Sequence, residues 1–432
     1  MERRMKSQIK KYHYENSEVQ RVQIVTLDKW TDLDFLRPVP YEKAYSHMAD
    51  IYEDYVIPKA SFLFGTLYFY TVPEDMELPF ECVHKDRFID SKIFLQKEYK
   101  NEKGKSFLKE LERRGCLRIV KGKRPFKVSF LPFRDSLGYL SESEKESPVR
   151  VNSSFFTFDV FDCPTPYDSH GMPLGLMVKD GKILNPPQYG REALLVDKDG
   201  TVSIRKISLK DIKISIKGKI YERPEYKRTP KEKGRDVFII QNRVVEVKEG
   251  GGNIIPSSGY IIHTDEEVKI GDTLEYQGLE GYVFAIQAGN SIVIEGVKTE
   301  KFLSPFYNIR KLERVSYPPS LYPLNFEKDR APRIALGEDE DHHPVIIWTE
   351  GPGKDSYTPG KDSCGASLRE LGDILMDLGI RNAVNLDGGG SAEILYKGRR
   401  ELKVSDRDLH NGKEKERPVP AGLYVSVQEE RR

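Results

Sequence analysis

The residues with the clearest capacity for chemistry form one short segment, NLDGGGS, at positions 385–391. Three consecutive glycines lose much conformational entropy on folding, so a fold keeps them where the backbone needs positive φ or approaches another group closely. A glycine-rich turn can expose backbone N–H groups as an anion-binding nest, and Ser391 adds a hydroxyl donor. Asp387 lies at the rim of the turn. The segment is therefore a candidate anion site with an adjacent acid, and a plain β-turn capped by Asp387 is the alternative.

The spacing of other reactive residues excludes several familiar sites. No GxxxxGK[ST] or GxGxxG segment is present, so the turn is neither a P-loop nor a dinucleotide fingerprint. No histidine forms a visible triad with Ser or Cys. His342 and His343 follow three carboxylates at 339–341 and could bind a divalent metal or form an exposed charged turn. Four dispersed cysteines, without a CxxC pair, are interpreted as free thiols, and a disulfide would need an oxidising compartment.

A helix and a strand are expected to position the glycine turn. Ser367 and Glu370 have the spacing of a capping box, and apolar residues follow at helical spacing until Gly379. A short apolar strand at 383–386 then leads into the turn. The preceding region consists of short β-rich runs separated by Asp-Gly dipeptides, which predict tight hairpins at 180–181 and 199–200.

The first 147 residues differ in texture from the rest. An aromatic run at 61–70 predicts a buried strand. Residues 97–127 hold 12 Lys or Arg against four Glu, which indicates either a patch that docks on a polyanion or a solvated helical face. The polar stretch SESEKESP at 141–148 resembles a linker. We place the domain boundary there.

Composition sets the broad class of the protein. The 432 residues are 38% hydrophobic and 32% charged, with a net charge of +1, so no global field attracts nucleic acid or an anionic membrane. No apolar run approaches the roughly 20 residues that span a bilayer, and the first residues lack the apolar stretch of a secretory signal. We therefore expect a globular, cytoplasmic protein without a membrane span, whose oligomeric state the sequence does not give.

An ordered series of segments resembles the motifs of the phosphodiester glycosidase family. The helix start at 365–371, followed by NAVNLDGGGS at 382–391, is similar to the family signature. Other similar segments are VNSSFF at 151–156, PLGLMVKDG at 173–181, GGNIIPSSGY at 251–260, APRIALG at 331–337 and RPV at 417–419. Together they extend over about residues 149–427.

The resemblance implies hydrolysis of a sugar-1-phosphodiester, which releases the sugar and leaves a phosphomonoester. Such chemistry needs a group that holds the anionic diester and a carboxylate at the anomeric centre. Arg333 is the candidate for the diester, aided by the amides of the glycine turn, with a structural ion pair as its alternative. Asp387 is the candidate carboxylate, as base or as nucleophile. Asn152 could position a sugar hydroxyl or acetamido group, or be a hydrogen-bonded strand-end residue.

Further residues near the turn are candidates for substrate binding. Glu393 is a second carboxylate, and a solvent-facing strand position is its alternative. Ser153 and Ser154 replace the small-Gly pair usual in the family, which adds hydroxyls beside Asn152. The proposed substrate-binding set is Gly388, Gly389, Gly390, Ser391, Asn385, Glu393 and Ser363.

The sequence as a whole predicts an α+β protein. An accessory α+β region would occupy residues 1–147, and residues 148–428 would form mixed β-sheets with one long helix packed behind the glycine turn. No cofactor is assigned, and a divalent cation is left open. The expected partner is a carbohydrate phosphodiester. A module that binds glycan phosphates without turnover is the alternative function.

Overall fold

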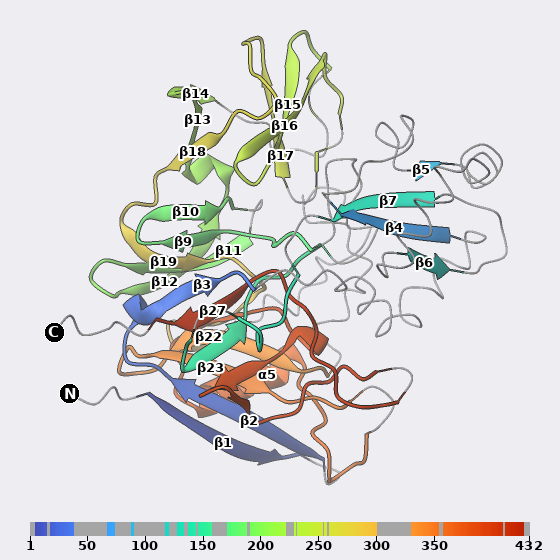
Figure 1. Ribbon diagram of the computed structural model, residues 1–432. Helices are drawn as coiled ribbons and strands as arrows, with labels where there is room; N and C mark the ends of the chain where they lie inside the picture. The colour runs from blue at the N-terminus through green and yellow to red at the C-terminus, as the bar shows by residue number, and fades with distance from the viewer. Residues whose placement is uncertain are drawn as a thin grey trace.

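The architecture of the computed structural model is shown in Figure 1. The described residues are 5–14, 18–38, 137–143, 146–157, 171–187, 191–221, 229, 231–253, 255–256, 259–299, 330–353, 357–408 and 411–426, together with the backbone of strands at 67–73, 88–89, 117–120 and 128–133.

A seven-stranded antiparallel sheet forms the centre of the part that carries the glycine turn. In spatial order its strands are β1 (Lys6–His13), β2 (Val19–Thr26), β23 (Pro344–Thr349), β22 (Arg333–Glu338), β24 (Asn382–Asn385), β20 (Ser291–Ile294) and β21 (Val297–Lys298).

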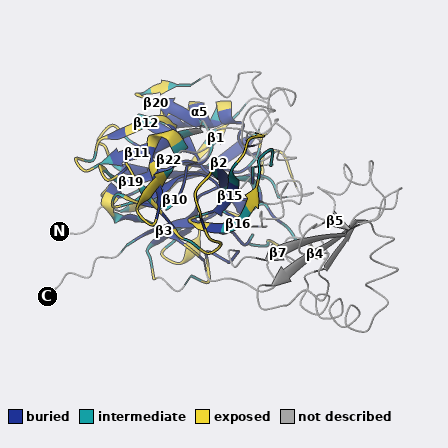
Figure 2. Cartoon of the chain, turned by 90° about the horizontal axis from the view of Figure 1, so that it is seen from above, coloured by how far each residue is buried: buried dark blue, intermediate teal, exposed yellow. Residues whose placement is uncertain are grey.

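The central strands β23, β22 and β24 of this sheet are buried along their whole length, on both faces. Ile334 and Leu336 of β22 point into one hydrophobic core, and Ala335 between them points into another. The second core is closed by helix α5 (Leu368–Asp377), whose buried residues recur at the expected helical spacing. The buried interior is dark blue in Figure 2.

The predicted helix is present, but the predicted fold class is wrong. Ser367 caps α5, and both hydrogen bonds of the capping box with Glu370 are formed. The helix has only ten residues and is the sole α-helix among the described residues. Nearly all other regular structure is antiparallel β-sheet, so this part of the protein is a β-sheet assembly and not an α+β fold with a long helix.

Two five-stranded antiparallel sheets share the first core with the central sheet. One has the order β26 (Arg399–Arg400), β25 (Ile394–Tyr396), β8 (Val149–Asn152), β27 (Gly422–Val425) and β3 (Leu33–Leu36). The other has the order β10 (Lys182–Asn185), β9 (Met177–Lys179), β19 (Tyr282–Ile286), β11 (Arg191–Asp197) and β12 (Val202–Ile207).

Two small sheets lie farther up in Figure 1 and one lies to the right. The first pairs β14 (Lys219–Tyr221), β13 (Lys213–Ile216) and β18 (Leu274–Gln277), and the second pairs β16 (Arg243–Glu249), β15 (Arg235–Ile240) and β17 (Gly259–Thr264). The third has the order β5 (Phe88–Ile89), β7 (Val128–Phe133), β4 (Leu67–Pro73) and β6 (Leu117–Val120), with β4 and β7 parallel. Short 3₁₀ turns lie at Trp30–Asp32, Leu209–Asp211 and Gly389–Ser391.

The hairpins predicted from Asp-Gly dipeptides are confirmed. Asp180 and Gly181, both with positive φ, join β9 to β10, and Gly200 with positive φ lies in the turn between β11 and β12. The aromatic run at 61–70 contributes its last residues to β4, and the rest of that run lies outside the described residues.

The N-terminal strands join sheets formed by the end of the chain. Strand β2 pairs with β23, and β3 pairs with β27. The polar stretch at 141–148 is also attached, because Ser141 donates to Glu416 and Ser147 donates to the carbonyl of Val425. The division at residue 147 stays a prediction, and strands of one sheet lie on both sides of it.

Several expectations fall outside the described residues. These are the basic excess at 97–127, apart from backbone strand segments, and Cys82, Cys116 and Cys163. Cys364 is a buried free thiol. Within the described part of the chain, no helix combines the length and apolar character that crossing a bilayer requires.

Candidate active site

The register of β22 and β24 places Arg333 beside the glycine turn. Ala335 is opposite Asn385, and the N–H of Leu386 donates to Ile334 at 2.8 Å, so the chain leaving β24 runs along Arg333. The Arg333 side chain is buried, and its Nε donates to the carbonyl of Ala366 at 2.9 Å. The structure therefore brings together the guanidinium and the turn that the sequence singled out.

Each of the three glycines has its own structural reason. A Cβ on Gly388 would lie 2.7 Å from the carbonyl oxygen of Pro332, and Gly389 has a φ of +61° with open space around its Cβ position. A Cβ on Gly390 would lie within 2.0 Å of Arg417 and Asp406. Glycine is thus required by close packing at Gly388 and Gly390 and by positive φ at Gly389. The groups that pack closely belong to the protein and not to a ligand.

Three amides of the turn donate to protein acceptors and are not open to an anion as a nest would require. The N–H of Gly388 donates to the Asp387 carboxylate at 3.0 Å, that of Gly389 to Pro332 at 2.9 Å, and that of Ser391 to Gly388 at 3.2 Å. These three donors are occupied by protein acceptors, because the turn folds into a 3₁₀ helix against β22. The predicted role of these amides in holding the diester is therefore not carried further.

The carboxyl group of Asp387 holds its proton more tightly than an ordinary aspartate does. Its carboxylate accepts hydrogen bonds from the N–H of Gly388 and from the side chain of Ser391. Burial outweighs both bonds and raises the pKa of Asp387 to about 7. The group therefore changes between its neutral and ionised forms near neutral pH, which suits a catalytic acid or base.

A buried ion pair that sequence analysis missed lies directly behind the turn. Arg417 contacts Asp406 through Nε at 2.8 Å and Nη2 at 3.0 Å, and its Nη1 donates to Ser391 at 3.1 Å. Both partners are about one-tenth exposed. Arg417 was noted only as part of an RPV segment, and Asp406 carries no sequence signal, because only the folded chain brings residues 406 and 417 together.

Asn152 is tied to the protein backbone at both ends of its amide. Its Nδ2 donates to the carbonyl of Asp387 at 2.7 Å, and its Oδ1 accepts from the N–H of Glu393 at 3.1 Å. The side chain is 1% exposed. It therefore clamps both ends of the 387–393 loop, which corresponds to the hydrogen-bonded alternative and not to contact with a sugar.

Glu393 is buried and not solvent-facing. It forms an ion pair with Arg400 at 3.3 Å, and burial followed by the neighbouring Glu416 raises the pKa of its carboxyl well above the usual range. We do not assign it a contact with substrate.

Four buried polar atoms near the turn have no hydrogen-bond partner among the described residues. They are the hydroxyls of Ser153 and Ser154, Oδ1 of Asn385 and Oε1 of Glu393. Ser153 accepts the N–H of Asp387 through its backbone carbonyl at 2.9 Å, so its position is tied to the acid. Unpaired polar atoms of this kind are costly unless water or a ligand satisfies them, which keeps Asn385 in the candidate binding set and adds Ser153 and Ser154 to it.

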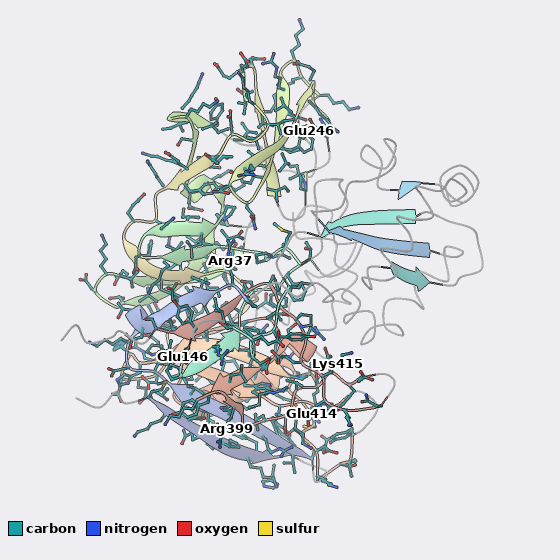
Figure 3. The ribbon with its side chains drawn as sticks, viewed as in Figure 1. Arg37, Glu146, Glu246, Arg399, Glu414 and Lys415 are labelled. Atoms are coloured by element: carbon teal, nitrogen blue, oxygen red, sulfur yellow. The ribbon has the colours of Figure 1, made fainter. Side chains whose placement is uncertain are left out.

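Ser363 lines a polar pocket with a volume of about 490 Å³. The pocket is bounded by Arg21, Glu350, Gly351, Gly353, Asp362, Ser363, Lys403, Arg407, Gly412, Lys413 and Glu414. Glu414 is labelled in Figure 3. The pocket adjoins the glycine turn through Pro332, whose carbonyl accepts from Gly389 and whose ring lies against Gly351.

Of the three acids that line this pocket, Glu350 is paired with several protein donors. Glu350 is 2% exposed and accepts from Arg21 at 2.6 Å, Ser363 at 2.5 Å and the backbone of Lys403 at 2.9 Å. The ammonium groups of Lys403 and Lys413 make no ion pair with another described residue. They are thus available to an anionic or polar ligand.

The residues at 339–343 form a charged turn. His342 contacts Glu338 at 3.1 Å and His343 contacts Asp339 at 3.5 Å. Among the described residues, no group of three or more His, Cys, Asp or Glu is arranged to hold a metal ion.

A family model describing phosphodiester glycosidases matches residues 210–426, which is half of the chain. The chain belongs to the phosphodiester glycosidase family. The matched residues include Arg333, the glycine turn, Asp406 and Arg417, whereas Asn152 precedes them. No curated protein matches the chain by sequence.

Solved structures similar to this phosphodiester glycosidase family member come from bacteria and an animal. A hypothetical protein from Synechocystis is 16% identical with a TM-score of 0.44, and the match covers 97% of this chain and 61% of that chain. The chain thus spans less than two thirds of that protein. The catalytic domain of zebrafish N-acetylglucosamine-1-phosphodiester alpha-N-acetylglucosaminidase, auto-inhibited by its pro-peptide, is 12% identical with a TM-score of 0.43, at 99% and 84% coverage. A protein from Burkholderia pseudomallei is 12% identical with a TM-score of 0.40, at 98% and 97% coverage.

Proposed function

We propose that the chain hydrolyses the glycosidic bond of a sugar-1-phosphodiester, with Asp387 as the carboxylate at the anomeric centre and Arg333 beside it. Membership of the phosphodiester glycosidase family supports the reaction class. The observation that carries the assignment of the acid is the place of Asp387 in the glycine turn that packs against Arg333 of β22, where burial raises its pKa to about 7.

The reaction adds water across the bond between the anomeric carbon and the phosphate oxygen. The C–O bond breaks, its electron pair leaves with the phosphomonoester, and the oxygen of water becomes the new sugar hydroxyl. A phosphate leaving group is already acidic, so the site needs little help from a general acid. The demand falls on a carboxylate that either attacks the anomeric carbon or takes a proton from water.

The polar pocket beside the turn supports the same proposal. Its volume of about 490 Å³ suits a sugar phosphate, and Lys403 and Lys413 offer charge to an anionic group. We propose that it receives part of the substrate. Asp387 would then act at the edge where Pro332 separates the pocket from the turn.

The test is incubation of the purified chain with a panel of sugar-1-phosphodiesters, with and without a chelator. We expect equal amounts of free sugar and phosphomonoester, and we expect Asp387→Asn to lose this turnover. The anomeric configuration of the first product, followed by NMR, separates the two roles of Asp387, because a nucleophile gives retention and a base gives inversion.

Two outcomes would contradict the proposal. Full turnover by Asp387→Asn would remove this acid from the chemistry. Saturable binding of a sugar-1-phosphodiester without any product would favour a binding module that lacks turnover. A loss of activity with chelator would instead show that the reaction requires a divalent cation, which the sequence left open.

A further inference from the structure

Four polar side chains form a continuous chain of contacts that ends at the candidate acid. Asp406 holds Arg417 through two nitrogens, at 2.8 and 3.0 Å. Arg417 uses its remaining Nη1 on Ser391 at 3.1 Å, and Ser391 contacts the Asp387 carboxylate. Nothing in the proposed reaction so far uses Arg417 or Asp406.

The chemistry of these groups fixes the direction of each hydrogen bond. A guanidinium can only donate, so the Ser391 oxygen accepts from Arg417. A hydroxyl has one proton, and the oxygen that accepts from Arg417 directs that proton toward the carboxylate of Asp387. Without Arg417, the Ser391 hydroxyl could rotate to another acceptor. The guanidinium therefore makes Ser391 a dedicated donor to the acid.

The guanidinium is held rigidly in the geometry that this role requires. Two parallel contacts to Asp406 fix its plane, which is the strongest arrangement available to such a pair. Gly390 packs against both side chains, with no room there even for a Cβ atom. The third glycine of the turn is therefore needed to let this pair reach Ser391.

We propose that Arg417 and Asp406 are positioning residues, which orient the Ser391 hydroxyl as a fixed donor and so keep the Asp387 carboxylate ionised for reaction. This inference rests on the proposed function, because it assigns Asp387 as the reacting carboxylate. It adds two residues outside the turn to the site and gives Ser391 an electrostatic role in place of direct phosphate binding.

Other charged groups near this chain of contacts act separately. Burial raises the pKa of Asp387, whereas the bonds from Ser391 and Gly388 lower it. Arg333 lies beside the turn on β22 with its Nε on a backbone carbonyl, and Glu393 is paired with Arg400. Removal of the Ser391 donor should therefore raise the pKa of Asp387 further above 7.

The test measures the pKa of Asp387 directly, by carbon NMR of labelled carboxyl groups, with Asp387→Asn to assign the signal. Ser391→Ala should raise this pKa by about one unit, because a hydrogen bond to a charged group contributes about 1.5 kcal/mol or more. Arg417→Gln should raise it by a similar amount, and the double variant should exceed neither single variant by much. Arg399→Gln, at an exposed position of β26 labelled in Figure 3, is the control.

An unchanged pKa in Arg417→Gln, alongside a raised pKa in Ser391→Ala, would overturn the proposal. If Arg417→Gln does not fold, Asp406→Asn serves instead, because it keeps the side-chain shape and loses the charge that holds the guanidinium. This measurement needs no turnover, so it separates the two hypotheses. If the variants show the expected pKa shifts but the wild-type chain has no activity, only the proposed reaction is rejected. If the wild-type chain is active but the variants show no pKa shift, only the positioning role is rejected.

Discussion

Two aspartates, one on a strand and one in the glycine turn, show how partners decide what an acid does. Asp236 on β15 is fully buried and accepts from His263 at 2.7 Å, from Asn253 at 2.7 Å and from Thr229. Asp387 has only the N–H of Gly388 and the hydroxyl of Ser391. Asp236 is surrounded by donors and links several segments of the chain, whereas Asp387 has few donors and burial raises its pKa to about 7.

The imidazole beside Asp236 strengthens this contrast. Nδ1 of His263 faces Asp236, and its Nε2 faces the carbonyl of Lys233 at 3.0 Å, so both ring nitrogens meet acceptors. The hydrogen bond to Asp236 raises the pKa of His263. The protonated ring satisfies both acceptors, and the cluster ties the loops at 229–234 and 253 to β15 and β17.

The largest expected effect is the loss of catalytic activity on substitution of Asp387, which we do not expect for Asp236. Asp387→Asn should lower kcat by about 10³-fold, the range for loss of a positioned acid or base. It should not lower the melting temperature at pH 8, because it replaces a buried charge that has few donors. Turnover assays and thermal unfolding at pH 8 check both parts, and a variant that is active or strongly destabilised would break the comparison.

Asp236→Asn should have the opposite pattern. It removes the charge on which His263, Asn253 and Thr229 converge, and loss of one partner of a buried pair costs ~3 kcal/mol. Urea unfolding measures this loss of stability, and kcat of the remaining folded protein should match wild type. If Asp236→Asn were as stable as the wild type, this cluster would not be a structural clamp.

The glycine turn provides a matched pair of substitutions. Gly390→Ala should lower the free energy of unfolding by about 2 kcal/mol, because the new Cβ overlaps the Arg417–Asp406 pair. Gly389→Ala should cost about 1 kcal/mol, since it meets open space and only the positive φ is unfavourable. Denaturant titration of both variants checks the order, and equal costs would contradict the packing argument.

The two sites should also differ in the pH range that affects stability. The raised pKa of Asp387 favours its neutral form, so its contribution falls as pH rises from about 4 to 7 and is constant above. The raised pKa of His263 gives a contribution that is complete below about 6.5 and is lost as pH rises through the shifted value. The free energy of unfolding should be measured from pH 4 to 9. In Asp387→Asn its pH dependence between about 4 and 7 should disappear, and in His263→Gln its pH dependence above about 6.5 should disappear. The opposite assignment would refute these pKa directions.

The smallest expected effect concerns the pocket beside the turn. Lys403→Ala should raise KM about threefold with little change in kcat, because a solvent-accessible ammonium contributes less than about 1 kcal/mol to binding an anion. Steady-state kinetics at low salt checks this, with Arg399→Ala as the control. An equal rise in the control would remove the pocket from substrate binding.

The fold was only partly predictable because its local and long-range parts carry different signals. The Ser367 capping box and the Asp-Gly hairpin after β9 were predicted correctly, since neighbouring residues form them. The α+β class was wrong. Short apolar strands such as β22 and β24 have partners far away in the chain, and no local pattern records that most of them combine into antiparallel sheets.

The candidate site divides in a similar way. Residue type and order were enough to select Asp387, Arg333 and the glycine turn, and the family resemblance is confirmed. Sequence reasoning offered the turn amides and Asn152 either to the substrate or to the protein itself, and the folded chain bonds three of these amides and the Asn152 side chain to protein groups. It also could not find Asp406, because the ion pair with Arg417 depends on how the chain returns behind the turn.

The amino-acid sequence by itself determined the family, the capped helix and the choice of Asp387 as the candidate acid, because these depend on residue types at short, fixed spacings. Only the tertiary structure decided which donors surround each carboxylate. Hydrogen bonding and desolvation act between groups that folding brings together, and those two effects give Asp387 and Asp236 different roles.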